Sequence, residues 1–163
     1  MTLGPLGAAH VTAAIVALAL GLVVLLATKG SPLHRLFGLG YVAAMVVVNA
    51  TALGLYRLNG QFGPFHALAL LSLAVVTMGV LAVLRRRANW LARHYQSMAY
   101  SYLGLCAAAL AEAAVRLKLF GPLVNGAGGI IILGVAIAVL FAALGYLIIP
   151  RLQRAALGTI ADR

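Results

Sequence analysis

The sequence predicts an all-α integral membrane protein with five transmembrane helices. Its composition is the first observation: 64% of the 163 residues are hydrophobic and 9% are charged, a balance typical of a chain that lies in lipid. The second observation is the length of the apolar stretches, since one span needs about 20 such residues and five spans nearly fill the chain. Residues 1–163 are therefore expected to form a single transmembrane domain.

The five helices are expected to form a four-helix core with a fifth, peripheral helix. Proline and glycine indicate several of the limits, because proline is tolerated in the first turn of a helix and glycine often follows the end of one. Pro32 and Pro64 lie at the starts of the second and third helices, and residues 121–126 (GPLVNG) separate the last two. The expected ranges are residues 6–28, 34–56, 65–84, 91–116 and 127–149.

The net charge of +10 does not indicate a nucleic-acid partner, because the basic residues lie at the ends of apolar stretches. Cytoplasmic loops of membrane proteins are enriched in lysine and arginine. The basic residues divide nine to three, so we expect a bacterial inner-membrane protein with its N-terminus outside and its C-terminus in the cytoplasm. The inner group is Lys29, Arg35, Arg85, Arg86, Arg87, Arg93, Arg151, Arg154 and Arg163, and the outer group is Arg57, Arg116 and Lys118.

The fourth predicted helix has one small, polar face. His94 and Glu112 are 18 residues apart, which is five turns of a helix, so they share this face near opposite ends. A carboxylate inside a span is costly, by about 2.5–3.5 kcal/mol, unless it is paired or protonated. The favoured explanation is an ion pair between Glu112 and Arg116, one turn further on. The alternative is that Glu112 exchanges a proton beside an outer cofactor or contacts a quinol.

The four histidines of the chain each lie near the start of one of the first four helices. Consecutive helices run antiparallel, so the helices that carry His10 and His66 begin at the outer face. Those that carry His34 and His94 begin at the inner face. Two histidines make a poor zinc site, which needs three or four ligands, whereas haem iron needs only two axial ligands. The pattern therefore predicts two haem b groups, one per membrane face. Anchoring of a polar ring in the membrane interface is the alternative for each histidine alone.

Other residues near the histidines fit a flat, anionic cofactor. Small residues on the same helical faces, such as Gly38 beside His34, would leave room for a macrocycle, although such stripes also typify close helix contacts in lipid. Haem propionates are anions at the membrane edge. The basic residues expected to contact them are Lys29, Arg35 and Arg93, but the inside-positive charge bias alone would also explain these three.

A set of marks along the first four helices resembles a known family. These marks are His10, Lys29-Gly30, His34-Arg35-x-x-Gly38, His66 and His94-x-x-x-Met98. They are similar to those of a bacterial family of small predicted membrane proteins with a domain-of-unknown-function label. That resemblance implies no activity, but it adds Met98 to the candidate cofactor-binding residues.

A looser similarity is to the two-haem b-type cytochromes that carry electrons from ascorbate across membranes. In those proteins alternate core helices share a haem, which implies the pairing His10 with His66 and His34 with His94. They usually have six helices with the core in the middle, whereas here the core would be the first four. The resemblance implies transmembrane electron transfer but does not identify the donor or the acceptor; a quinone and a small reductant are the classes considered.

Two other functions stay open at this point. One is a haem-free structural or assembly subunit that joins other membrane subunits through its small-residue faces. The other is a proton-coupled transporter that uses Glu112 and the histidines as a relay, although broken helices in inverted repeats are not evident.

Overall fold

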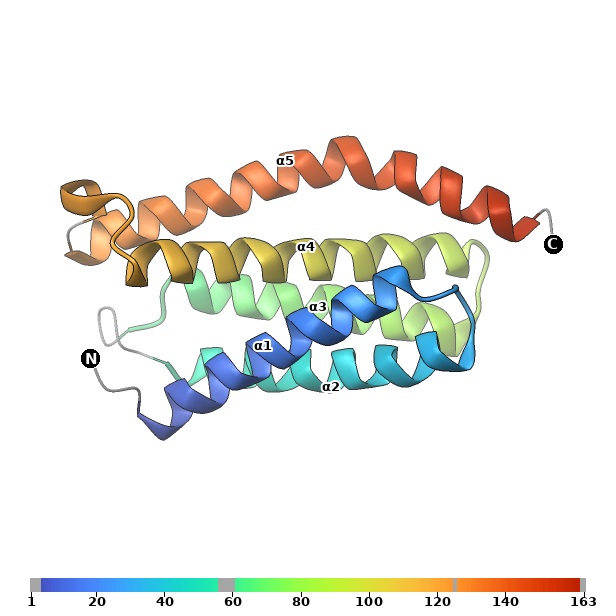
Figure 1. Cartoon of the computed structure of the whole chain (residues 1–163), viewed down its shortest axis with the longest axis horizontal. Coiled ribbons are helices and arrows are strands. Elements are labelled where there is room, and N and C mark those ends of the chain that lie inside the picture. The colour runs from blue at the N-terminus through green and yellow to red at the C-terminus, as the bar shows by residue number, and fades with distance from the viewer. Residues whose placement is uncertain (1–3, 56–60, 125, 162–163) are drawn as a thin grey trace. The chain divides into compact units, whose positions relative to one another are not determined.

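A computed structural model describes residues 4–55, 61–124 and 126–161 of the chain. These residues form five α-helices and one short 3-10 turn, with no strand among them (Figure 1). The elements are α1 (Pro5–Leu26), α2 (Pro32–Leu53), α3 (Pro64–Arg85), α4 (Trp90–Arg116), η1 (Gly121–Val124) and α5 (Gly126–Ala161). Predicted features at Tyr56, Arg57, Asn125 and Arg163 lie outside the described residues.

The predicted fold class is confirmed. Each of the five α-helices contains a segment long and apolar enough to cross a bilayer. The observed limits of α1 to α4 lie within three residues of the predicted ones. The expected break between the last two spans is also present, because η1 occupies most of it.

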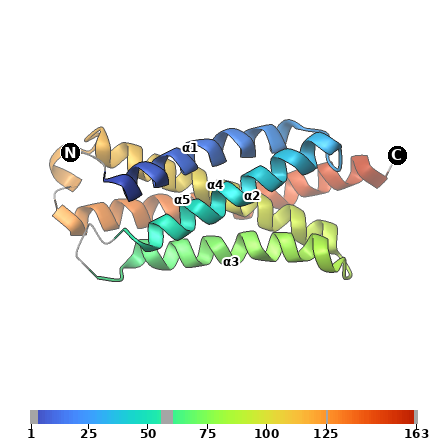
Figure 2. The same ribbon diagram turned by 90° about the horizontal axis from the view of Figure 1, so that it is seen from below.

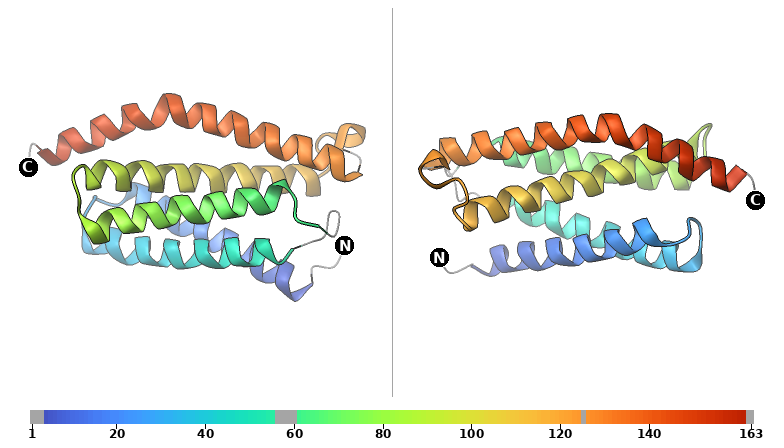
Figure 3. Two further views of the ribbon diagram at one scale, coloured as in Figure 1. Left: turned by 180° about the vertical axis from the view of Figure 1, so that it is seen from behind. Right: turned by 45° about the horizontal axis from the view of Figure 1, so that its top comes forward.

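The predicted end of the fifth helix at residue 149 is wrong, because α5 continues through Pro150 to Ala161. A proline inside a helix removes one backbone hydrogen bond and bends the helix without always ending it. Side chains after the proline donate to carbonyls one turn back: Arg151 Nη1 to Leu147 O at 3.0 Å, and Arg154 Nε to Pro150 O at 3.3 Å. Figure 3 shows that α5 changes direction along its length.

The chain divides into two compact units, Met1–Leu73 and Ala74–Arg163. In the first unit α1 and α2 pack side by side as an antiparallel hairpin (Figure 2). On α1 the buried positions include Ala17, which is fully buried, and Gly21. On α2 they include Tyr41 and Met45, which lie on the same helical face as His34.

The turn between α1 and α2 has a residue suited to each backbone requirement. Gly30 adopts a positive φ of 80°, which glycine accepts without steric cost. Ser31 caps α2, because its Oγ accepts a hydrogen bond from the His34 N–H at 3.1 Å. Pro32 occupies the first turn, where no N–H is needed. The turn thereby fixes where α2 begins.

In the second unit α4 packs along α5, and two glycines allow close approaches between helices. A Cβ at Gly145 of α5 would lie 2.7 Å from Leu103 Cδ2 and 2.8 Å from Tyr100 Cε1, both on α4. A Cβ at Gly79 of α3 would meet the Met98 side chain of α4 and lie 3.1 Å from Ser97 Cβ. Small residues permit such contacts between helices in lipid.

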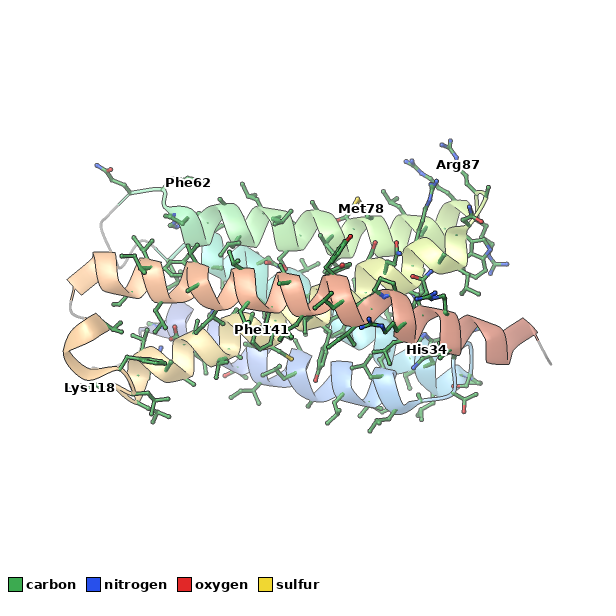
Figure 4. The ribbon with its side chains drawn as sticks, turned by 90° about the horizontal axis from the view of Figure 1, so that it is seen from above. His34, Phe62, Met78, Arg87, Lys118 and Phe141 are labelled. Carbon is green, nitrogen blue, oxygen red and sulfur yellow. The ribbon has the colours of Figure 1, made fainter. Side chains whose placement is uncertain are left out.

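A basic turn joins α3 to α4. Its three arginines are exposed, and Figure 4 shows Arg87 in this turn. Arg86 has a positive φ of 41°, and its guanidinium lies 5.4 Å from the centre of the Trp90 ring, within the range of a cation–π contact. Asn89, the residue before α4, also has a positive φ, of 59°, a conformation that asparagine tolerates better than most residues.

We expect Gly145→Leu to destabilise the protein by about 1–3 kcal/mol, because the new side chain has no room between α4 and α5. Thermal unfolding in detergent, followed by circular dichroism, measures this change. Gly104→Leu is the matched control, since a Cβ at Gly104 has no other atom within 4 Å. Equal losses in the two variants would contradict a close contact specific to Gly145.

Candidate functional site

All four histidines lie within two turns of a helix start, as predicted. In the first unit His10, on α1, contacts the C-terminal end of α2, and His34, on α2, contacts Val24 near the end of α1. His10 and Val24 are 14 residues apart on one helix, which is roughly 21 Å along its axis. The α1–α2 hairpin therefore carries one histidine near each of its two ends.

His10 links α1 to α2 through its Nδ1 atom. This atom lies 3.1 Å from Val48 O and 3.0 Å from Thr51 Oγ1. The Thr51 hydroxyl donates its own hydrogen within α2, to Val47 O at 2.7 Å, so its oxygen accepts from His10. The imidazole of His10 is half-buried at this contact.

His34 and Lys29 share one backbone acceptor at the end of α1. His34 Nδ1 lies 3.4 Å from Val24 O, a long hydrogen bond, and Lys29 Nζ donates to the same oxygen at 3.1 Å. The ammonium also donates to Leu25 O at 2.6 Å and to Ala27 O at 3.3 Å. Lys29 thus caps the C-terminal end of α1, where the helix dipole favours a cation.

This capping arrangement changes how Lys29 is interpreted. An ammonium group has three hydrogens, and here they face three backbone carbonyls. Partial burial lowers the pKa of the Lys29 amine, because desolvation disfavours its charged form. A propionate contact, predicted from the sequence, would require Lys29 to leave at least part of this cap.

His94 connects α4 to α3 in the second unit. Its Nδ1 lies 3.0 Å from the carbonyl oxygen of Gly79. Met98, one turn further along α4, packs against the same glycine. The missing side chain at Gly79 allows α4 to approach closely enough for this hydrogen bond, so the predicted pair His94 and Met98 has a common contact on α3.

His66 is arranged differently from the other three histidines. Its Nδ1 accepts a hydrogen bond from the backbone N–H of Gly63 at 3.0 Å, and the backbone N–H of His66 donates to Gly63 O at 3.0 Å. This pattern resembles a capping box, with histidine at the position usually taken by Glu or Gln and the Gly63 carbonyl in place of the usual Ser or Thr side chain. The Phe62 ring stacks on the imidazole with centres 5.1 Å apart. His66 therefore caps α3.

The hydrogen bonds assign the proton on each ring. A carbonyl oxygen only accepts, so Nδ1 carries the proton in His10, His34 and His94, and in the neutral ring the lone pair is on Nε2. Metal-binding histidines commonly donate their other N–H to a backbone carbonyl in this way. In His66 the assignment is reversed, because Nδ1 accepts and the buried Nε2 carries the proton.

The remaining predicted residues lie at or near the surface of the chain. Arg35 and Arg93 are exposed, and a Cβ at Gly38 would have no other atom within 4 Å, which is consistent with the room expected there. The predicted ion pair is confirmed: Arg116 Nε donates to Glu112 Oε1 at 2.6 Å. The side chains of both partners are about half exposed. The polar face of α4 is therefore not buried at the position of Glu112.

Two residues that contact the histidines, Thr51 and Gly79, are not predicted from the sequence. A hydroxyl residue and a glycine within apolar helices are nevertheless signals of interhelical contact. The buried Asn49 does not contribute to these interhelical contacts through its Nδ2, which donates within α2, to Met45 O at 2.8 Å. Within the described ranges, no three His, Cys, Asp or Glu side chains gather as a metal site.

The fold and these contacts define a class, the all-helical proteins with several membrane spans. Within that class, residues 7–152 match the profile of the family described as "Predicted membrane protein (DUF2306)". The match covers most of the 163 residues, so the chain belongs to this family, as the sequence marks indicated. No curated protein and no solved structure matches the chain.

We expect Lys29→Met to lower the free energy of unfolding by about 1 kcal/mol, because three carbonyls at the end of α1 lose a charged donor. Chemical or thermal unfolding in detergent measures this loss. Lys118→Met removes the same charge from an exposed residue between α4 and η1 and is expected to have little effect. If the two variants unfold alike, Lys29 does not stabilise α1 through its cap.

Proposed function

We propose that this protein is a b-type cytochrome that carries electrons across a bacterial inner membrane. In this proposal His34 and His94 bind one haem near the inner face, and His10 and His66 bind a second near the outer face. The main support is the ring protonation of His10, His34 and His94, whose Nδ1–H groups bond to backbone carbonyls. That arrangement leaves Nε2 in the state that coordinates iron.

The residue set favours haem over other metals. In this proposal each membrane face has two imidazoles, a number that matches the two axial positions of haem iron and falls short of the ligands that zinc normally takes. When bound, haem supplies an iron centre that accepts and releases one electron. The positions of His10 and His34 at opposite ends of one hairpin support separate centres at the two faces.

The protein's own groups have defined tasks in this proposal. The carbonyls of Val48, Val24 and Gly79 would hold the three rings in a fixed orientation, with Nε2 as the nitrogen that would coordinate iron. Arg35 and Arg93 are exposed near the inner histidines in sequence and supply cations for propionates. Glu112 is assigned a structural role, because it pairs with Arg116.

One observation favours a second candidate, a haem-free structural or assembly subunit. Lys29 and His66 both cap helices, so two of the predicted cofactor-binding residues already stabilise the fold without a cofactor. In such a subunit, the other histidine hydrogen bonds would serve only to hold neighbouring helices together. The absorption spectrum separates the two candidates, because only a b-type cytochrome has haem bands.

We expect the detergent-purified protein to show a Soret band and a reduced α band. His34→Ala and His94→Ala should each abolish the same haem component, because each removes one axial ligand of the same iron. His10→Ala should abolish the other component. Gln96→Ala, which changes an exposed residue two positions from His94, should leave both. A purified wild type without haem bands would exclude the cytochrome.

We expect a reporter fused after Arg163 to be active only in the cytoplasm, because most basic residues lie on the predicted inner side of the helices. Paired fusions of alkaline phosphatase and a fluorescent protein measure this. The same reporters fused within the 117–125 connection should give the opposite result. A periplasmic C-terminus would exchange the inner and outer assignments of the two histidine pairs.

A further inference from the structure

The capping box at the start of α3 has a consequence for coordination by His66. Its Nδ1 lone pair is occupied by the Gly63 N–H at 3.0 Å, and its Nε2 carries the proton of the neutral ring. Neither nitrogen can coordinate iron in this arrangement. The other three histidines differ, since their protons are on Nδ1 and bond to carbonyl or hydroxyl oxygens.

Moving the proton within the ring does not remove the conflict. If Nε2 gave up its proton and Nδ1 took it, the new Nδ1–H would point at the Gly63 N–H, and two donors would face each other at 3.0 Å. His66 can therefore act as an axial ligand only if its ring leaves Gly63. The Gly63 N–H, which has no backbone acceptor within α3, would then need another acceptor.

We infer that His66 alternates between two roles, as a cap of α3 and as a haem ligand. As a consequence, the inner haem site fills before the outer one. This inference rests on the proposed function. The inner site needs no change of ring protonation at His34 or His94, and it fills first. The outer site needs His66 to give up its cap, so it binds haem more weakly.

The test is a titration of the full-length apoprotein with hemin in detergent, followed by the Soret band. The wild type is expected to bind in two steps. Gly63→Pro removes the N–H that holds His66, so the second step should become roughly fivefold tighter, the change that a capping bond of about 1 kcal/mol corresponds to. Gly63→Ala keeps the N–H and has room for its Cβ, so it should titrate as the wild type does.

Two variants of His66 separate its roles. Glutamine also serves at this capping position, so His66→Gln should keep the melting temperature of the apoprotein but bind only one haem. His66→Leu should lose both the outer haem and part of the stability. Equal melting temperatures for His66→Leu and His66→Gln would show that the cap is unimportant and would overturn the inference.

The possible outcomes distinguish the inference from the function on which it rests. Two haems that bind with equal affinity, unchanged by Gly63→Pro, would overturn the exchange at His66 and leave the cytochrome intact. Two haems bound by His66→Gln would also overturn it, because the second iron would then have another ligand. A wild type that binds no hemin would reject the cytochrome and, with it, a ligand role for His66.

Discussion

The structure depends on hydrogen bonds between imidazole N–H groups and the backbone of a neighbouring helix. In the hydrocarbon core of a membrane no water satisfies polar groups, so each histidine inside a span needs a partner from the protein. His10, His34 and His94 find it in the oxygens of Val48, Val24 and Gly79. One kind of bond therefore connects α1 to α2 and α4 to α3 and also determines the protonation of the rings.

Helix ends impose the second requirement, because the first N–H groups and the last C=O groups of a helix have no partner within it. In this chain Ser31 and His66 accept hydrogen bonds from N–H groups at the starts of α2 and α3, and Lys29 donates to carbonyl groups at the end of α1. Two residues that the sequence associates with a cofactor, Lys29 and His66, thus cap helices instead. Under the proposed function, haem binding would compete with capping at Lys29 and His66, whereas the hydrogen bonds of His34 and His94 would assist it.

Part of the candidate site was predictable from sequence, and part was not. The positions of the histidines along the helices and the pair Glu112–Arg116 follow from helical periodicity, which relates residues three or four apart in any sequence. The partners of His10 and His94 do not, since Thr51 and Gly79 are 41 and 15 residues away in the chain. His66 differs from the other histidines in that its Nδ1 accepts a hydrogen bond and theirs donates one. This difference depends on which backbone group faces the ring, and residue composition does not encode it.

The sequence alone determined the membrane class, the five spans and nearly all of their limits, because the apolar length needed to cross a bilayer is a local property. It misplaced the end of α5, since a proline bends a helix or ends it according to the packing and side-chain bonds around it. Only the tertiary structure decided which glycines are close contacts: a Cβ at Gly79 or Gly145 would meet side chains of α4, whereas a Cβ at Gly38 or Gly104 would have no other atom within 4 Å. The same residue type has either role, because the space around a backbone is set by the neighbouring helix and not by its own sequence.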